Sequence, residues 1–271
     1  MPGSSFGPRC ALSLLLAAAG LYAQAATPTA NIPKWTPPAQ AETLYYSVEW
    51  RLIPAGYATI ALAKNAPGTN DGYRTEVHVT SSGLLDKLFR VEDVYHADYE
   101  GSFCAVESTM VAHEGKRQRE TKIKFDRAHN QASSVERDLT ANGKIVKQSE
   151  VATPSCVQDL VGGLYVLRTL HLEPGQSANI PVSDGKKSVA ARVEAQEREE
   201  IKTKAGTFHT LRYEAYIFNN VLYPRNARLM VWVTDDARRI PVQMRLKMTF
   251  TIGTVTLSLD RIGEESAKLA K

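Results

Sequence analysis

The sequence predicts a mainly β protein: one strongly curved antiparallel sheet, or open half-barrel, with a single buried helix. Apolar and polar residues alternate with period two through most of residues 43–262, as they do in strands that bury one face. Turn-forming pairs such as Asn-Gly and Asp-Gly separate these stretches at short intervals. Only one stretch spaces its apolar residues as a long helix does. About a dozen antiparallel strands around one helix favour a single domain that curls about its core.

Alternation predicts four strands in the first part of this domain: residues 44–50, 57–63, 73–80 and 91–99. One face of the first strand carries Leu44, Tyr46, Val48 and Trp50. The Ile-Pro-Ala-Gly run at residues 53–56 predicts the turn that follows it. Asn70-Asp71-Gly72 predicts the next turn, and residues 83–88 predict a short helix.

The middle of the chain is more polar. Strands are predicted over residues 103–113, 117–126, 131–139 and 144–151. Asn142-Gly143, between the last two, is the usual signal of a type I′ hairpin. Few apolar residues alternate in these two strands, so we expect them to be exposed.

One longer helix is predicted after Ser155. Ser155 is the expected N-cap, and Gln158 completes a capping box three residues later. Apolar residues then recur at helical spacing, at Val157, Leu160, Val161, Leu164 and Leu167. Pro174-Gly175 predicts the end of this helix.

The rest of the domain is predicted to be strand after strand. Hairpin turns are expected at Asp184-Gly185, Ala205-Gly206 and Asp235-Asp236. Residues 229–233 are apolar on both faces, which favours a strand deep in the sheet or curled round a cavity. Alternation continues through residues 242–250 and 255–259.

The N-terminus reads as a secretory signal peptide over residues 1–25. Arg9 precedes an apolar core at residues 11–19, and Ala23-Gln24-Ala25 offers small residues where a signal peptidase cleaves. The alternative, an uncleaved membrane anchor, is disfavoured because the apolar run is about half the roughly 20 residues that span a bilayer. We therefore expect a periplasmic protein without a transmembrane segment. A Pro-rich flexible lead-in should fill residues 26–42, a single β-rich domain residues 43–262, and a disordered tail residues 263–271.

Charge and cysteines narrow the function further. The formal net charge is +4 and is mixed along the chain, which argues against nucleic acid as a partner. Processing leaves two cysteines, Cys104 and Cys156, which are expected to form a disulfide in an oxidising compartment. The alternative is two buried free thiols. The sequence contains no Cys-x-x-Cys pair, so a role in redox catalysis is not expected.

No motif predicts a catalytic centre or a cofactor. Phosphate-binding loops, dinucleotide fingerprints, a nucleophile elbow and a His-Glu-x-x-His helix are missing from the sequence. His96 and Asp98 can face the same side of a strand, but two ligands are too few for a specific metal site. Arg90, Glu92 and Asp93 form a polar cluster that either positions a ligand or is an ordinary ion-pair network at a strand end.

Aromatic residues are spread over many of the predicted strands. If they line one concave face, they form an apolar pocket with hydroxyl groups, suited to an acyl chain or another hydrophobic ligand. The alternative is plain core packing. The apolar run at residues 218–224, Phe-Asn-Asn-Val-Leu-Tyr-Pro, is poorly explained by a core and is expected to be a lid or a partner contact.

Several blocks of the sequence resemble the family called domain of unknown function 3108: residues 44–58, 82–93, 117–127, 159–168, 203–208 and 232–242. The resemblance covers essentially all of residues 43–262. It implies an exported bacterial protein of the Gram-negative envelope, with no assigned catalytic residue. It also implies a fold similar to that of the periplasmic lipoprotein carriers LolA and LolB, in which a helix closes a curved sheet over an apolar cavity. Fold likeness does not fix function.

The leading hypothesis is a non-enzymatic periplasmic binder or carrier of a hydrophobic or lipid-like ligand, working without a cofactor or metal. Six residues are expected near the mouth of its cavity: Arg90, Glu92, Asp93, Tyr165, Arg168 and Trp232. One alternative is a structural or interaction module that docks on an envelope protein through its sheet edges or residues 218–224. Another is a hydrolase of envelope glycans or lipids, which needs converging carboxylates such as Glu92, Asp93 and Glu114.

Overall fold

The computed structural model describes residues 41–65, 71–248 and 253–263. The predicted signal peptide, the lead-in up to residue 40 and residues 264–271 of the predicted tail lie outside the described residues. So do Asn70 of the predicted turn and the end of the predicted strand at residues 242–250. The described domain begins with a strand at Glu42 and ends with a strand at Gly263.

Fourteen strands form a single antiparallel sheet, which confirms the predicted mainly β fold. They are β1 (Glu42–Trp50), β2 (Ile53–Lys64), β3 (Gly72–Ser81), β4 (Val91–Glu100), β5 (Ala105–Glu114), β6 (Arg117–Asp126), β7 (Gln131–Asp138), β8 (Lys144–Ala152), β9 (Ser177–Ser183), β10 (Ser188–Thr203), β11 (Gly206–Tyr216), β12 (Ala227–Thr234), β13 (Pro241–Met248) and β14 (Thr254–Gly263). Nearly every strand pairs with its neighbours in the chain. The exception is β1, which pairs with β14 and so joins β1–β8 to β9–β14. The sheet is not closed, and β8 and β9 are its edges.

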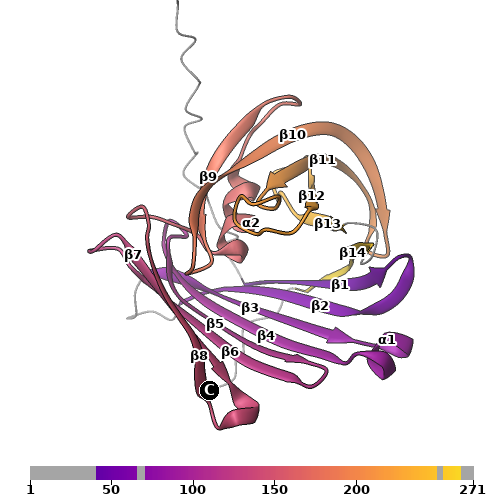
Figure 1. Cartoon of the computed structure of the whole chain (residues 1–271). Helices are drawn as coiled ribbons and strands as arrows, with labels where there is room; N and C mark the ends of the chain where they lie inside the picture. The colour runs from indigo at the N-terminus through magenta and orange to yellow at the C-terminus, as the bar shows by residue number, and fades with distance from the viewer. Residues whose placement is uncertain (1–40, 66–70, 249–252, 264–271) are drawn as a thin grey trace, which may run out of the picture. The chain divides into compact units, whose positions relative to one another are not determined.

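Helices are few. The short helix α1 (Gly83–Leu88) links β3 to β4, a single 3-10 turn η1 (Leu139–Ala141) follows β7, and α2 (Leu160–Thr169) lies between β8 and β9 in the chain. Figure 1 shows α2 inside the curve of the sheet, between β9–β14 and the broad layer of β1–β8. One helix therefore supplies core contacts to both parts of the sheet.

The start of α2 differs from the prediction. Asp159, not Ser155, is the N-cap, and its carboxylate accepts a hydrogen bond of 2.6 Å from the Gly162 amide. Gln158 does not complete a capping box because its backbone is used by the sheet edge: its amide donates to Pro181 and its carbonyl accepts from Ser183. The helix also ends earlier than Pro174, at Thr169, where Leu170 turns to an extended conformation.

The turn predicted at residues 53–56 is part of β2. The chain reverses instead at Arg51 and Leu52, which both have positive φ, 51° and 67°. Gly56 is needed for close packing: a Cβ there would lie 2.0 Å from the Thr80 carbonyl oxygen on β3. Asn142 and Gly143 do adopt the left-handed conformation of a type I′ turn, but η1 lengthens that connection.

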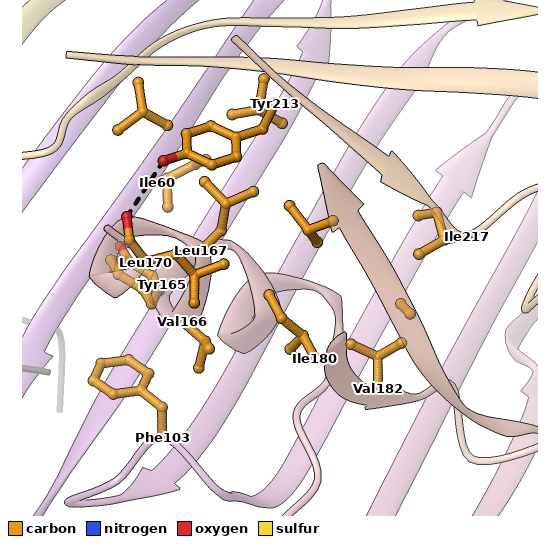
Figure 2. Packing of buried hydrophobic residues seen from close by; sticks show 14 of the residues in the cluster. Ile60, Phe103, Tyr165, Val166, Leu167, Leu170, Ile180, Val182, Tyr213 and Ile217 are labelled. Carbon is orange, nitrogen blue, oxygen red and sulfur yellow. Dashed lines mark hydrogen bonds between the residues drawn. The ribbon is translucent and has the colours of Figure 1, made fainter. Parts of the chain in front are cut away.

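Two buried arginines fix the C-terminal end of α2. Arg168 Nε donates to the Arg239 carbonyl at 2.8 Å, and Arg239 Nε donates back to the Arg168 carbonyl at 3.2 Å. The Arg168 guanidinium also forms two bonds to the Glu42 carboxylate at the start of β1. Figure 2 shows Tyr213 donating to the Leu170 carbonyl just beyond the helix. The last carbonyls of α2 therefore have side-chain donors, which a helix end inside a protein requires.

The predicted disulfide between Cys104 and Cys156 is present. It joins the β4–β5 turn to the chain between β8 and α2, with the Cα atoms 4.9 Å apart. The Ala105 amide adds a hydrogen bond of 2.9 Å to the Val157 carbonyl. Since Gln158 then bonds to β9, this short segment ties the strands of the first half to the free edge of the second.

Candidate functional site

A cavity of about 390 Å³ lies between the inner face of β3–β6 and the start of α2. Antiparallel register explains its floor, because residues paired across neighbouring strands point to the same face. One such row is Val77, Tyr95, Met110 and Thr121. Most of the lining is apolar, as in sites for small hydrophobic molecules. We call this space the inner cavity.

Three segments from later in the chain cover the inner cavity. Leu160 and Val161 come from the first turn of α2, and Tyr223 from the loop after β11. The end of β9 and the turn after it contribute Ser183, Asp184 and Lys186. The predicted apolar run 218–224 therefore contributes a wall of the cavity through Tyr223, while Leu222 is buried. Its role as a lid stays a prediction.

The carboxylate of Asp159, which is 3% exposed, is a buried charged group of the cavity lining. It accepts hydrogen bonds from the hydroxyls of Tyr95 and Tyr99, the latter at 2.9 Å. Burial raises the pKa of Asp159 above its ordinary value, while the bonds from Tyr95, Gly162 and Tyr99 act in the opposite direction. Burial also raises the pKa values of both tyrosines well above their ordinary value.

Ser108 is a second buried polar group in the lining, 2% exposed. Its hydroxyl lies near Tyr95 and lowers the pKa of that tyrosine. No described group lies in good hydrogen-bonding geometry to Ser108 Oγ. Buried hydroxyls without a partner are uncommon in folded proteins. Ser108 therefore adds a buried polar group to a lining that is mostly apolar.

Charged groups lie at the rim. Asp93 accepts a hydrogen bond of 3.0 Å from the His113 amide, and its pKa is raised by burial and then by the neighbouring Glu114. Lys186 pairs with Glu136 on β7 at 3.4 Å. A mostly apolar lining that also carries buried polar groups and charged side chains at its rim suits an amphiphilic molecule.

A second, smaller crevice of about 120 Å³ lies on the other side of α2, against β9–β12. It is lined almost entirely by aliphatic residues and shares Leu160 with the inner cavity. Gly163 contributes to this space, since a Cβ there would lie 3.3 Å from Val182. The start of α2 is thus the partition between two apolar spaces.

Of the six residues predicted near the cavity mouth, the structure places one, Asp93, in the lining of the inner cavity. Arg90 and Glu92 form an exposed ion pair of 3.1 Å. Glu92 alternates with Asp93 along β4, so it faces the other side of the sheet, and the three carboxylates named for a hydrolase do not converge. Asp93 and Glu114 alone are near each other.

The other three predicted residues are in the core. Tyr165 and Arg168 are buried on α2. Trp232 is 2% exposed and donates from Nε1 to Glu199 at 2.7 Å, with the Arg245 guanidinium 4.9 Å from its ring. The ligand-binding role assigned to these residues stays a prediction. The predicted set lacks Asp159 and Ser108, because Asp159 carries the signal of a helix N-cap rather than of a ligand-binding residue and Ser108 has no local signal.

Neither a metal centre nor a membrane helix is found in the part of the chain that the structure describes. No group of three or more His, Cys, Asp or Glu side chains there is arranged to hold a metal ion. No helix among those residues has the length and hydropathy to cross a bilayer.

Comparison with protein families gives one match over most of the chain. The model of the family described as "Protein of unknown function (DUF3108)" matches residues 45–260. No curated protein matches this sequence.

Solved structures with the same type of fold share little sequence with this chain. A β-barrel-like protein of the DUF1849 family from Brucella abortus is 8% identical, with a TM-score of 0.53, covering 84% of this chain and 99% of that one. A protein from Bacteroides fragilis, described as exported and YmcC-like in fold, is 11% identical with a TM-score of 0.36, covering 84% and 98%. At these identities the first likeness supports a β-barrel-like fold and nothing more.

Proposed function

Since the chain belongs to the DUF3108 family, whose function is unknown, we propose from its own residues that it binds a hydrophobic or lipid-like ligand in the inner cavity. The observation that carries this proposal is the cavity itself: about 390 Å³, mostly apolar, between β3–β6 and α2. Spaces of this size and lining hold small ligands in other proteins. We also propose that the helix closes the curved sheet over this cavity as it does in the LolA and LolB carriers.

The polar groups of the cavity support an amphiphilic ligand. Tyr95, Tyr223 and the buried Asp159 are concentrated where α2 begins, whereas Val77, Val79 and the crevice beyond Leu160 are aliphatic. A ligand can therefore place a polar end at the start of α2 and an apolar chain along the strands.

We further propose that the protein acts in the periplasm, after export through residues 1–25. The disulfide supports this location, because structural disulfides persist in oxidising compartments and are rare in the cytosol. A docking module remains the second candidate, and the open edge strand β8 is the observation that favours it.

Native mass spectrometry of the protein purified from the periplasm without detergent tests the binding function. A stoichiometric extra mass that extracts into organic solvent is expected, and it identifies the cargo. The same protein, delipidated, should bind an apolar fluorescent probe. A clean apo mass together with no probe binding would contradict the proposal and favour the docking module.

Met110→Trp locates the site. Met110 is half-exposed in the cavity lining, so an indole fills the space without replacing a core side chain. Probe affinity should fall about tenfold, which corresponds to about 1.4 kcal/mol. Thr109→Trp is the matched control, because Thr109 precedes Met110 on β5 and its side chain therefore faces the other side of the sheet. Equal affinities in the two variants would place the ligand elsewhere.

A further inference from the structure

The strands β1–β8 have two ends that differ in chemistry. Consecutive antiparallel strands alternate in direction, so the β1–β2 turn, α1, the β5–β6 turn and the β7–β8 turn share one end. Figure 1 shows α1 at this end, with the turns following one another along the rim. We call residues 51–53, 84–90, 115–117 and 139–147 the turn end.

Exposed apolar side chains gather at the turn end. Leu52 is 87% exposed, Leu88 73% and Leu84 62%. Ile53, Phe89, Ile145 and Val146 are also exposed there, and Tyr57 stands beside them on β2. Among the described residues, the other exposed large apolar side chains are Met110, Leu160 and Ile262, which are scattered and less exposed. Clustering of this kind marks an interaction surface, whereas single exposed residues do not.

Hydrogen bonds and one ring contact join α1 to the strand β2 and to the β5–β6 turn. The Ser82 amide at the start of α1 donates to the Ala55 carbonyl of β2 at 2.9 Å. The Gly115 amide of the β5–β6 turn donates to the Arg90 carbonyl at 2.7 Å. The Phe89 ring packs on Gly115, where a Cβ would be 3.0 Å from the ring. The apolar groups of β2 and α1 are therefore held near one another by short, hydrogen-bonded turns.

Lysines without carboxylate partners surround these apolar groups. Lys87, Lys116, Lys144 and Lys147 form no ion pair within the described ranges. The nearby carboxylates are engaged: Glu92 with Arg90, Glu114 with Arg117, and Asp138 with Arg119. Asp86 bonds to the Ser81 hydroxyl. The positive charge of the four lysines is therefore available to an external anion.

We propose that the turn end docks on an anionic lipid surface. Leucine and phenylalanine side chains enter the boundary between headgroups and acyl chains, while lysines bind the phosphate headgroups, as amphipathic elements do at membranes. Charge complementarity selects this partner, because the same apolar groups against a neutral surface would leave four lysines unused. Docking is reversible and peripheral, and it is independent of whether the inner cavity binds a ligand.

Vesicle flotation with the secreted, purified protein tests this proposal. The protein should float with mixed phosphatidylglycerol and phosphatidylcholine vesicles and stay unbound with pure phosphatidylcholine. Raising the salt concentration should weaken binding, since exposed charges are screened. Binding of equal strength to both vesicle types would overturn the electrostatic part of the proposal.

Two variants separate the contributions. Leu84→Ser with Leu88→Ser should lower vesicle binding at least about tenfold, because both side chains are exposed and contribute to the apolar contact. Lys87→Glu with Lys116→Glu should lower it by a similar factor. Lys124→Glu with Lys202→Glu, at two exposed lysines near the other end of the sheet, is the matched control for charge and should bind as the wild type does.

All these positions are exposed, so the variants should keep the urea midpoint of the wild type. Wild-type binding in the Leu84→Ser, Leu88→Ser variant would overturn the proposal. So would dimerisation of the wild type that the same variant abolishes, because the apolar surface would then serve self-association. Loss of ligand from the inner cavity, with vesicle binding intact, would count against the proposed function alone.

Discussion

The two ends of strands β1–β8 share one sheet but use their charged residues differently. At the end opposite the turn end, three ion pairs join neighbouring strands and turns: Lys64 with Asp71, Arg74 with Asp98, and Arg127 with Glu100. The disulfide and the buried Arg168–Glu42 pair lie at that end too. At the turn end the arginines are paired, but four lysines form no ion pair among the described residues and stand beside exposed leucines. The difference indicates that one end maintains the fold and the other is available for contact.

The largest expected effect at the paired end is that of Arg168→Met. The change leaves the Glu42 carboxylate and two backbone carbonyls without their donor in a buried site. Loss of one partner of a buried ion pair costs about 3–5 kcal/mol. Urea unfolding should show this loss, and adding Glu42→Gln should recover part of it. A loss below about 1 kcal/mol would show that the pair contributes little.

Removal of the disulfide should have the next largest effect. Cys104 and Cys156 are 52 residues apart, and a loop of that length corresponds to about 4 kcal/mol in the chain-entropy description, of which about 2–4 kcal/mol is usually observed. Cys104→Ser with Cys156→Ser should lower the free energy of unfolding by that amount. Reductant should destabilise the wild type equally and leave the double variant unchanged.

Asp159→Asn should change the pH dependence of stability. The folded pKa of Asp159 is raised by burial, so its contribution is fully present below the unfolded pKa and is lost as pH rises through the folded pKa. Asparagine does not titrate and can still accept from the Gly162 amide. The stability of the variant relative to wild type should therefore increase with rising pH. A pH-independent difference in urea unfolding would mean that Asp159 titrates normally.

The smallest effect is expected from Leu84→Ser at the turn end. Its side chain is 62% exposed, so the free energy of unfolding should change by less than about 0.5 kcal/mol. Differential scanning calorimetry against the wild type measures this. A loss comparable to that of Arg168→Met would remove the distinction between the two ends.

Strands were predictable because alternation is a local property. Residues 73–80 and 91–99 show it clearly, and both are strands. The start of α2 was not predictable in this way. Gln158 bonds to the edge strand β9, and nothing in the sequence around Gln158 indicates that long-range contact. The turn at Arg51 and Leu52 was also missed, since neither residue is a usual left-handed turn former.

The site was less predictable than the fold. Asp159 accepts hydrogen bonds from Tyr95 and Tyr99, which are 64 and 60 residues away in sequence. The two tyrosines share one face of β4, and they meet Asp159 because the start of α2 packs on that face. Arg168 and Trp232 have the side chains of ligand-binding residues, yet Glu42 and Glu199 occupy their donors. Composition alone does not distinguish a donor that serves the core from one that serves a ligand.

The pairing of β1 with β14 has a consequence for how the chain can be rewired. Thr43 is the register partner of Gly263, so the two ends of the described domain lie side by side. Elements that adjoin at their termini tolerate new connections, and exposed turns tolerate new ends. A short linker from residue 263 to residue 42, with the chain reopened at Asn142-Gly143, would keep every strand pair. The same sheet could thus form from a chain in which β8 comes first and β7 last.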